Sequence, residues 1–190
     1  MMLLLTTNIY SVVLFPALPL GVLLVLFLIL FLSVRKARNL SLLALPSELP
    51  PEQEPNDLRF GRTSGYYAGS FLKGQRYLLL PLQVWGKGFG GTGNGKVWLS
   101  RQAIILRRYL IRTPVIVPYA LIHRIEVRKG AMAGGKYYPG AIIIVTWGRE
   151  ELPTVSYFGI AGGLELAAAW AKEIARRGDA LKWQQTDTAS

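Results

Sequence analysis

The stretch GFGGTGNGK, residues 88–96, contains the residues of this chain that most resemble a phosphate-binding loop. Its glycines fit the dinucleotide pattern G-x-G-x-x-G, and residues 90–96 fit a Walker A loop up to its last position. In both motifs the phosphate binds at the N-terminus of a helix that follows the loop. Here a strand-like run, VWLS, follows instead. Val97 replaces the Mg²⁺-binding Ser or Thr, and residues 108–118 offer no carboxylate for a ribose. We therefore predict a glycine-rich connection between strands that binds no nucleotide.

His123 is the only histidine of the chain, and there is no cysteine. Strand alternation places His123 on the same apolar face as Ile125 and Val127, so we expect a buried, hydrogen-bonded side chain. A metal site usually needs three or four protein ligands, which one histidine cannot supply. Ser100 and Ser156 have no evident base beside them. The sequence thus predicts no catalytic residue, no metal site and no cofactor, and a protein that is not an enzyme.

The first 34 residues are uncharged, and residues 9–34 form an apolar run of 26 residues. A bilayer-spanning helix needs about 20 such residues, so this run predicts a retained transmembrane helix. A cleaved signal peptide is the alternative, but its apolar core is shorter and follows a basic start. Arg35, Lys36 and Arg38 come directly after the run. The positive-inside rule then predicts a single-pass protein of the cell (inner or plasma) membrane, with residues 1–8 outside and the C-terminal domain in the cytoplasm.

Residues 35–58 begin with these basic residues and continue as a proline-rich, acidic segment. Clustered prolines oppose helix formation and favour an extended spacer, so we interpret the segment as a linker. Its first leucines are expected to rest at the membrane interface; they are Leu40, Leu42, Leu43 and Leu45.

Residues 59–178 have the composition of one globular domain. They contain 18 of the 22 Lys and Arg residues but only 5 of the 11 Asp and Glu residues, which leaves this domain at +13. Short β-branched and aromatic runs alternate with turn residues, a pattern that predicts antiparallel strands. The expected strands are residues 76–85, 96–100, 103–109, 115–119, 122–129, 141–147 and 152–158.

Residues 163–177 predict an amphipathic helix, followed by a polar tail, residues 179–190, that is expected to fray. Glu173 and Arg177 have the spacing of a favourable ion pair, and Gly178 is expected to stop the helix. Four apolar residues fall within about 100° of arc and are expected to be buried: Leu166, Ala167, Trp170 and Ile174. The fold class expected is one N-terminal transmembrane α-helix plus a mainly antiparallel β sandwich or partly open barrel, closed by the C-terminal helix.

Between residues 76 and 178 the chain resembles bacterial membrane-associated proteins with a PH-like (pleckstrin-homology-like) domain. The similar run comprises a G-x-V-x-L-S strand, an apolar strand ending in basic residues, a "VP" strand and an I-x-x-I-x-V strand, here at residues 95–100, 103–108, 115–118 and 122–127. The resemblance implies lipid or protein binding. Eukaryotic relatives bind phosphoinositides through K…[K/R]-x-R. Here Arg107 and Arg108 are adjacent, so specific inositol-phosphate recognition is not implied.

Basic residues are the candidates for contact with an anionic inner leaflet, where each Lys or Arg contributes about 1 kcal/mol. They are Arg35, Lys36, Arg38, Arg101, Arg107, Arg108, Arg112, Arg124, Arg128, Lys129 and Lys136. Ordinary solvated surface charge is the alternative interpretation. Three aromatic residues near glycine-rich turns are expected at the level of the lipid headgroups: Phe89, Tyr137 and Tyr138.

Two functions follow from these observations. The first is a non-enzymatic, membrane-anchored scaffold or accessory subunit that binds a partner protein, within a larger membrane complex, at the cytoplasmic face. The second is a module that binds anionic lipid through its basic surface. Nucleic-acid binding is not predicted, because the membrane anchor argues against it.

Overall fold

The structure is a computed structural model that describes residues 21–33, 35, 39, 45–46, 48–55, 57–74, 89 and 91–187. The chain divides into two compact units, residues 1–37 and 38–190. We describe each unit by itself.

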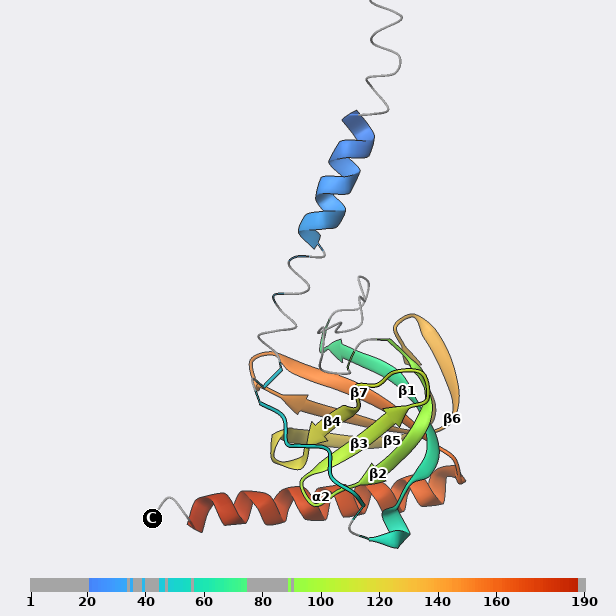
Figure 1. Ribbon diagram of the computed structural model, residues 1–190, viewed down its shortest axis with the longest axis vertical. Coiled ribbons are helices and arrows are strands. Elements are labelled where there is room, and N and C mark those ends of the chain that lie inside the picture. Colours follow the sequence, from blue (N-terminus) through green and yellow to red (C-terminus); the bar gives the residue numbers. More distant parts are fainter. Residues whose placement is uncertain are drawn as a thin grey trace, which may run out of the picture. The chain divides into compact units, whose positions relative to one another are not determined.

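The described part of the first unit is a helix, residues 21–33, drawn in blue in Figure 1. Its apolar side chains are exposed on every side, with exposed fractions between 51% and 68% from Val22 to Leu32. Among the described residues, no helix has both the length and the apolarity that a membrane crossing needs. The predicted span also includes residues 9–20 and Val34, which lie outside the described residues.

Within the described residues, the second unit is a seven-stranded antiparallel sheet followed by a long helix (Figure 1). The strand order is β4-β3-β2-β1-β7-β6-β5, so β1 lies at the centre and joins the two halves of the sheet. The elements are η1 (Leu58–Phe60), β1 (Thr63–Leu72), β2 (Gly93–Leu99), β3 (Ala103–Arg108), β4 (Val115–Pro118), η2 (Tyr119–Leu121), β5 (Ile122–Ala133), β6 (Lys136–Gly148), β7 (Pro153–Ile160) and α2 (Gly163–Asp187).

Six of the seven predicted strands are confirmed as β2 to β7, and the arrangement is consistent with the expected partly open barrel. The seventh, residues 76–85, lies entirely outside the described residues, so it stays a prediction. The sequence pattern missed β1, because its small residues resemble a turn. A β-bulge between Tyr67 and Gly69 interrupts its pairing with β7, and Gly69 has φ +114°.

Glycines allow β1 and its neighbours to approach closely. Gly65 pairs with Gly95 of β2, and a Cβ on Gly65 would lie 2.5 Å from the carbonyl oxygen of Gly159. A Cβ on Gly95 would lie 2.1 Å from the carbonyl oxygen of Arg107. The last glycines of the 88–96 stretch therefore belong to strand β2, as the absence of a following helix predicted, and they serve backbone packing.

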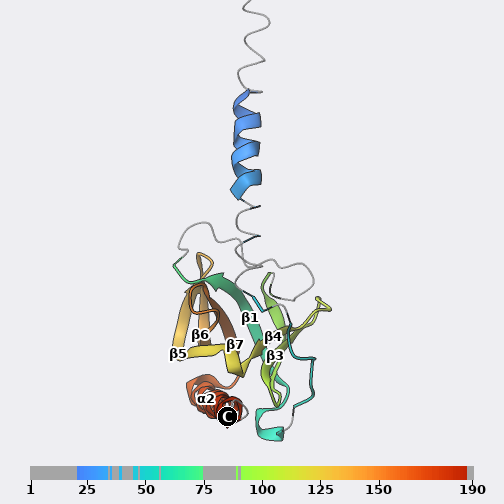
Figure 2. The ribbon, with the colours of Figure 1, turned by 90° about the vertical axis from the view of Figure 1, so that its left-hand side faces the viewer.

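Helix α2 lies across one end of the sheet (Figures 1 and 2). Its buried face contains Ala167, Trp170 and Ile174, as predicted, and Leu166 packs partly against the same core. The Trp170 ring meets Phe60 edge-on, with ring centroids 6.0 Å apart. The helix thus closes the main apolar core at this end.

A polar contact ties α2 to the β2–β3 turn. Arg177 donates from Nη1 to the carbonyl oxygen of Ser100 (2.6 Å) and from Nε to Glu173 (2.7 Å), which confirms the predicted ion pair. Tyr119 donates to the same Ser100 oxygen at 3.1 Å. Arg176 donates two hydrogen bonds to Glu173. The bonds from Arg176 and then Arg177 lower the pKa of Glu173 to about 2, against the opposing effect of burial.

The expected end of the helix at Gly178 is wrong, because α2 continues to Asp187. Gly178 is buried, and a Cβ there would lie 3.5 Å from the carbonyl oxygen of Tyr119. The glycine serves the close approach of α2 to η2 instead of helix termination. Much of the tail that was expected to fray is therefore helical.

The expected burial of His123 is also wrong. The register of β5 against β6 shifts between Ile122 and Arg124, so a bulge at His123 breaks the alternation on which the expectation rests. The side chain is exposed, and its Nε2 donates to the carbonyl oxygen of Gly148 at 2.7 Å. The expected hydrogen bond is present, but on the surface.

The segment interpreted as a linker is, in its described part, packed on the second unit. Leu45, expected at the membrane interface, is buried in the main core instead, and Leu49 packs partly against it. Leu40, Leu42 and Leu43 lie outside the described residues. We call residues 48–55, which follow Leu45 along the surface, the strap.

The close approach at Gly95 gives a test of the fold. We expect Gly95→Ala to destabilise the second unit by about 3 kcal/mol, because the new methyl group meets backbone that no rotamer can move away. Urea unfolding of the chain in mild detergent, followed by tryptophan fluorescence, measures this change. Gly93→Ala is the matched control in the same strand, because its Cβ would meet Arg108 Cδ at an ordinary 3.4 Å. Equal stability of the two variants would contradict the packing argument.

The lowered pKa of Glu173 predicts an acid-sensitive helix contact. A depressed pKa stabilises the fold above the ordinary glutamate pKa of about 4.5, and this stability is lost as the pH falls toward 2. We expect Glu173→Gln to remove about 2 kcal/mol near neutral pH and to flatten the stability profile between pH 5 and about 2. Denaturant unfolding across this range measures the slope. Glu165→Gln, at an exposed position of the same helix, is the control and should keep the steep profile.

Candidate membrane-facing surface

Tyr109, Leu110 and Ile111 form an exposed apolar group directly after β3. The Leu110 side chain is 97% exposed and Tyr109 is 64% exposed. Arg107 and Arg112, which flank the group, are exposed as well. We call residues 109–114 the β3–β4 loop. Large exposed apolar side chains between cations suit the boundary between lipid headgroups and acyl chains.

The tip of the β5–β6 hairpin repeats this composition. Met132 is 60% exposed and Tyr137 is 58% exposed, and Lys136 is exposed beside them. Lys129, farther along β5, is exposed as well. The hairpin bends back over β1: a Cβ on Gly134 would lie 3.0 Å from the ring of Phe71. The apolar and basic tip is thus held against the end of the central strand.

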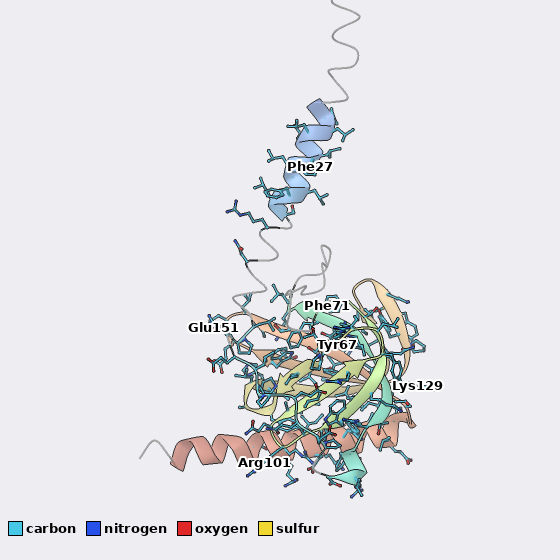
Figure 3. All side chains as sticks on the ribbon, viewed as in Figure 1. Phe27, Tyr67, Phe71, Arg101, Lys129 and Glu151 are labelled. Carbon is cyan, nitrogen blue, oxygen red and sulfur yellow. The ribbon has the colours of Figure 1, made fainter. Side chains whose placement is uncertain are left out.

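Both groups lie at the end of the sheet away from α2. Strand β3 begins at the β2–β3 turn, which α2 holds through Ser100, so the β3–β4 loop follows from the other end of β3. The β5–β6 tip packs on Phe71, near the end of β1. Figure 2 shows the tip of the hairpin away from α2, and Figure 3 shows Phe71 away from α2 as well. Arg101 lies in the β2–β3 turn beside α2 (Figure 3), so it belongs to the opposite end.

Arg124 and Arg128 form a different arrangement on β5. Both are exposed and both pair with Glu126, at 3.1 Å and 2.6 Å. The hydrogen bond from Arg128 is the main cause that lowers the pKa of Glu126. These two arginines are therefore partly neutralised by a shared carboxylate, and they offer less charge to an anionic surface than their number indicates.

The prediction of a lipid-facing Arg108 is wrong, because this side chain is only 3% exposed. Its guanidinium lies over the Tyr67 ring, 5.6 Å from the centroid, and donates to the carbonyl oxygen of Gly91 at 3.3 Å. Burial lowers the pKa of the Arg108 guanidinium. Strand alternation explains the contrast with exposed Arg107, since consecutive side chains of β3 point to opposite faces.

Phe89, expected at the headgroup level, is buried as well, and its ring lies 5.2 Å from that of Trp147. Beside it, buried hydrogen bonds link Trp147 to Ser156, Ser156 to Ser70, Ser70 to Tyr67 and Tyr67 to the carbonyl oxygen of Phe89. The indole N–H can only donate and the carbonyl can only accept, so each hydroxyl donates to the next group in this order. Burial raises the pKa of the Tyr67 phenol, which keeps the chain of donors neutral.

The remaining candidates are placed as follows. Arg35 is helical and exposed in the first unit, whereas Lys36 and Arg38 lie outside the described residues. No group of carboxylates and His123 that could hold a metal ion occurs among the described residues. The apolar members of the surface, Leu110 and Met132, were not predicted, because positive charge alone defined the candidate residues. For Leu110 the signal is the short apolar run of residues 109–111 between arginines.

No model of a known protein family matches this chain, and no curated protein matches it. The exposure, apolarity and charge of the surface side chains are therefore the basis for a functional proposal.

The neighbouring arginines Arg107 and Arg108 give a matched test of this assignment. We expect Arg108→Ala to destabilise the second unit by about 2 kcal/mol, because it removes the packing on Tyr67 and a buried hydrogen bond. Arg107→Ala should change the stability by less than about 1 kcal/mol, because its ion pair is exposed. Unfolding in urea measures both. The reverse order of the two effects would show that Arg108 is not a structural residue.

Proposed function

We propose that this protein is a non-enzymatic, membrane-anchored module whose β domain docks on an anionic bilayer through the β3–β4 loop. The observation that carries the proposal is the exposure of Leu110 and Tyr109 between Arg107 and Arg112. A leucine side chain that is almost fully in water contributes no free energy of burial, whereas a bilayer interface would bury it. The Lys136 side chain at the β5–β6 tip adds a cation at the same end.

Each side chain of this surface contributes a modest free energy to membrane binding. Full burial of one leucine side chain stabilises by about 1.5–3 kcal/mol, and each Lys or Arg near an anionic leaflet adds about 1 kcal/mol. Such a loop is expected to hold a domain reversibly at a membrane that it already neighbours. Weak, reversible binding is enough for a domain that a transmembrane anchor already keeps close to the bilayer.

The anchor of this proposal is the apolar run of residues 9–34, of which residues 21–33 form the described helix. The basic residues after the run support a cytoplasmic β domain by the positive-inside rule. The meander order of the seven strands and the closing helix α2 support the resemblance to PH-like domains. A protein-binding scaffold is the first function predicted from the sequence and lipid binding is its alternative, and the following experiment separates the two.

The test follows the environment of Leu110 in the full-length protein. Because the chain has no cysteine, Leu110→Cys accepts a single environment-sensitive fluorophore. We expect its emission to shift to the blue in vesicles of phosphatidylcholine with phosphatidylglycerol, and to shift back at high salt as the arginines are screened. Pure phosphatidylcholine should give little shift.

The matched control carries the fluorophore at Glu165→Cys, an exposed position at the start of α2. This site should show no lipid-dependent shift, because α2 lies at the opposite end of the sheet. Equal emission of the Leu110 label with and without anionic lipid would reject lipid docking and leave the protein-binding scaffold.

A further inference from the structure

Three consecutive residues of the strap are each held by a side chain that lies in the sheet or directly before β1. Glu52 forms an ion pair with Arg107 of β3. The carbonyl oxygen of Gln53 accepts a 2.7 Å hydrogen bond from the indole N–H of Trp98 in β2. Glu54 accepts two hydrogen bonds from Arg62, at 2.6 Å and 2.8 Å. We call Arg62, Trp98 and Arg107 the clasp.

The geometry of the clasp fits an extended acidic chain. The Trp98 side chain fixes one backbone carbonyl, and the two arginines take the carboxylates on either side of it. The Arg62 guanidinium also lies 5.1 Å from the centre of the Trp98 ring, which orients it toward Glu54. Pro50, Pro51 and Pro55 flank the three residues and favour an extended backbone. The chemistry that the clasp recognises is therefore oxygen anions presented beside a carbonyl.

One member of the clasp also belongs to the membrane-facing surface. Arg107 lies two residues before Tyr109 in the sequence, next to the exposed apolar group of the β3–β4 loop. Its side chain is 56% exposed even with Glu52 in place, and Glu52 itself is 25% exposed. An anion that arrives from solvent can reach Arg107 from its open side. Leu45 and the Trp98 bond hold the rest of the strap on the domain, so Glu52 can turn away without release of the strap.

We propose that the strap is an internal competitor of the membrane: Glu52 and anionic lipid headgroups compete for Arg107, and docking of the β3–β4 loop displaces Glu52 from the clasp. This inference rests on the proposed function, because it names how lipid docking is restrained. It commits to lipid phosphate as the competing anion. The strap thereby raises the density of anionic lipid at which the domain docks, and it disfavours docking on weakly charged membranes.

The experiment measures the fraction of phosphatidylglycerol in vesicles at which the Leu110→Cys fluorophore reaches half of its emission shift. In the full-length protein, Glu52→Gln is expected to lower this fraction about threefold, an effect of the size of one exposed ion pair. Glu48→Gln is the matched control, because it removes the same charge from an exposed strap position outside the clasp. The control should shift the midpoint much less.

A double-mutant cycle separates competition at Arg107 from general repulsion. If Glu52 acts by occupying Arg107, Glu52→Gln will lower the midpoint in an Arg107→Gln background no more than Glu48→Gln does. If Glu52→Gln lowers the midpoint equally in both backgrounds, or no more than Glu48→Gln does, the competition is rejected while lipid docking stands. If the fluorophore responds to anionic lipid in none of these variants, the proposed function and this inference both fail.

Discussion

The close approach of strand backbones at β1 is the constraint on which the rest of the second unit depends. Gly65 and Gly159 lack the side-chain atoms that would separate β1 from β7, and Gly95, which pairs with Gly65, lacks the Cβ that would meet the backbone of Arg107 in β3. Because β1 is the central strand of the order, this contact makes one sheet out of two three-stranded halves. The β3–β4 loop belongs to one half and the β5–β6 hairpin to the other, so their placement at a common end requires that junction. Helix α2 then closes the opposite end and holds the β2–β3 turn through Arg177.

The parts of the fold that the sequence predicted are those whose pattern is periodic. Strands β2 to β7 show β-branched alternation, and the buried face of α2 repeats at helical spacing, so both were recognisable. Strand β1 was not, because TSGYYAGSFL uses glycine and serine for packing, and these residues also mark turns. The bulge at His123 and the contact of Gly178 with Tyr119 depend on partners distant in sequence. A local pattern carries no information about such contacts.

In the candidate site too, the local sequence does not predict which charged side chains are exposed. Arg107 and Arg108 are indistinguishable in the sequence, yet one lies in solvent and the other covers the Tyr67 ring in the core. The alternation of β3 separates them, but the sequence does not say which face is buried, since Ile104 and Ile105 are both buried on opposite faces. The strap explains this double burial. It lies over the face that carries Trp98, so both faces of β2 and β3 are covered. The acidic segment is consequently part of the fold as well as the connection to the apolar helix.

Because the acidic strap packs on the domain, the net charge of +11 is not spread evenly over its surface. A uniform cationic surface would attract an anionic bilayer from any side, and its attraction would set no orientation. Here Glu126 neutralises part of β5, and Glu52 and Glu54 cover arginines on the strap side. Cations remain beside exposed apolar side chains in the β3–β4 loop and at the β5–β6 tip, and also at Arg59, which follows the fully exposed Leu58. In the docking that we propose, the bilayer interface takes up both charge and apolar side chains, and the end of the domain with the loop and the tip offers two such groups. In this proposed docking, the orientation follows from the neutralisation of the other faces more than from any excess of charge at the tip.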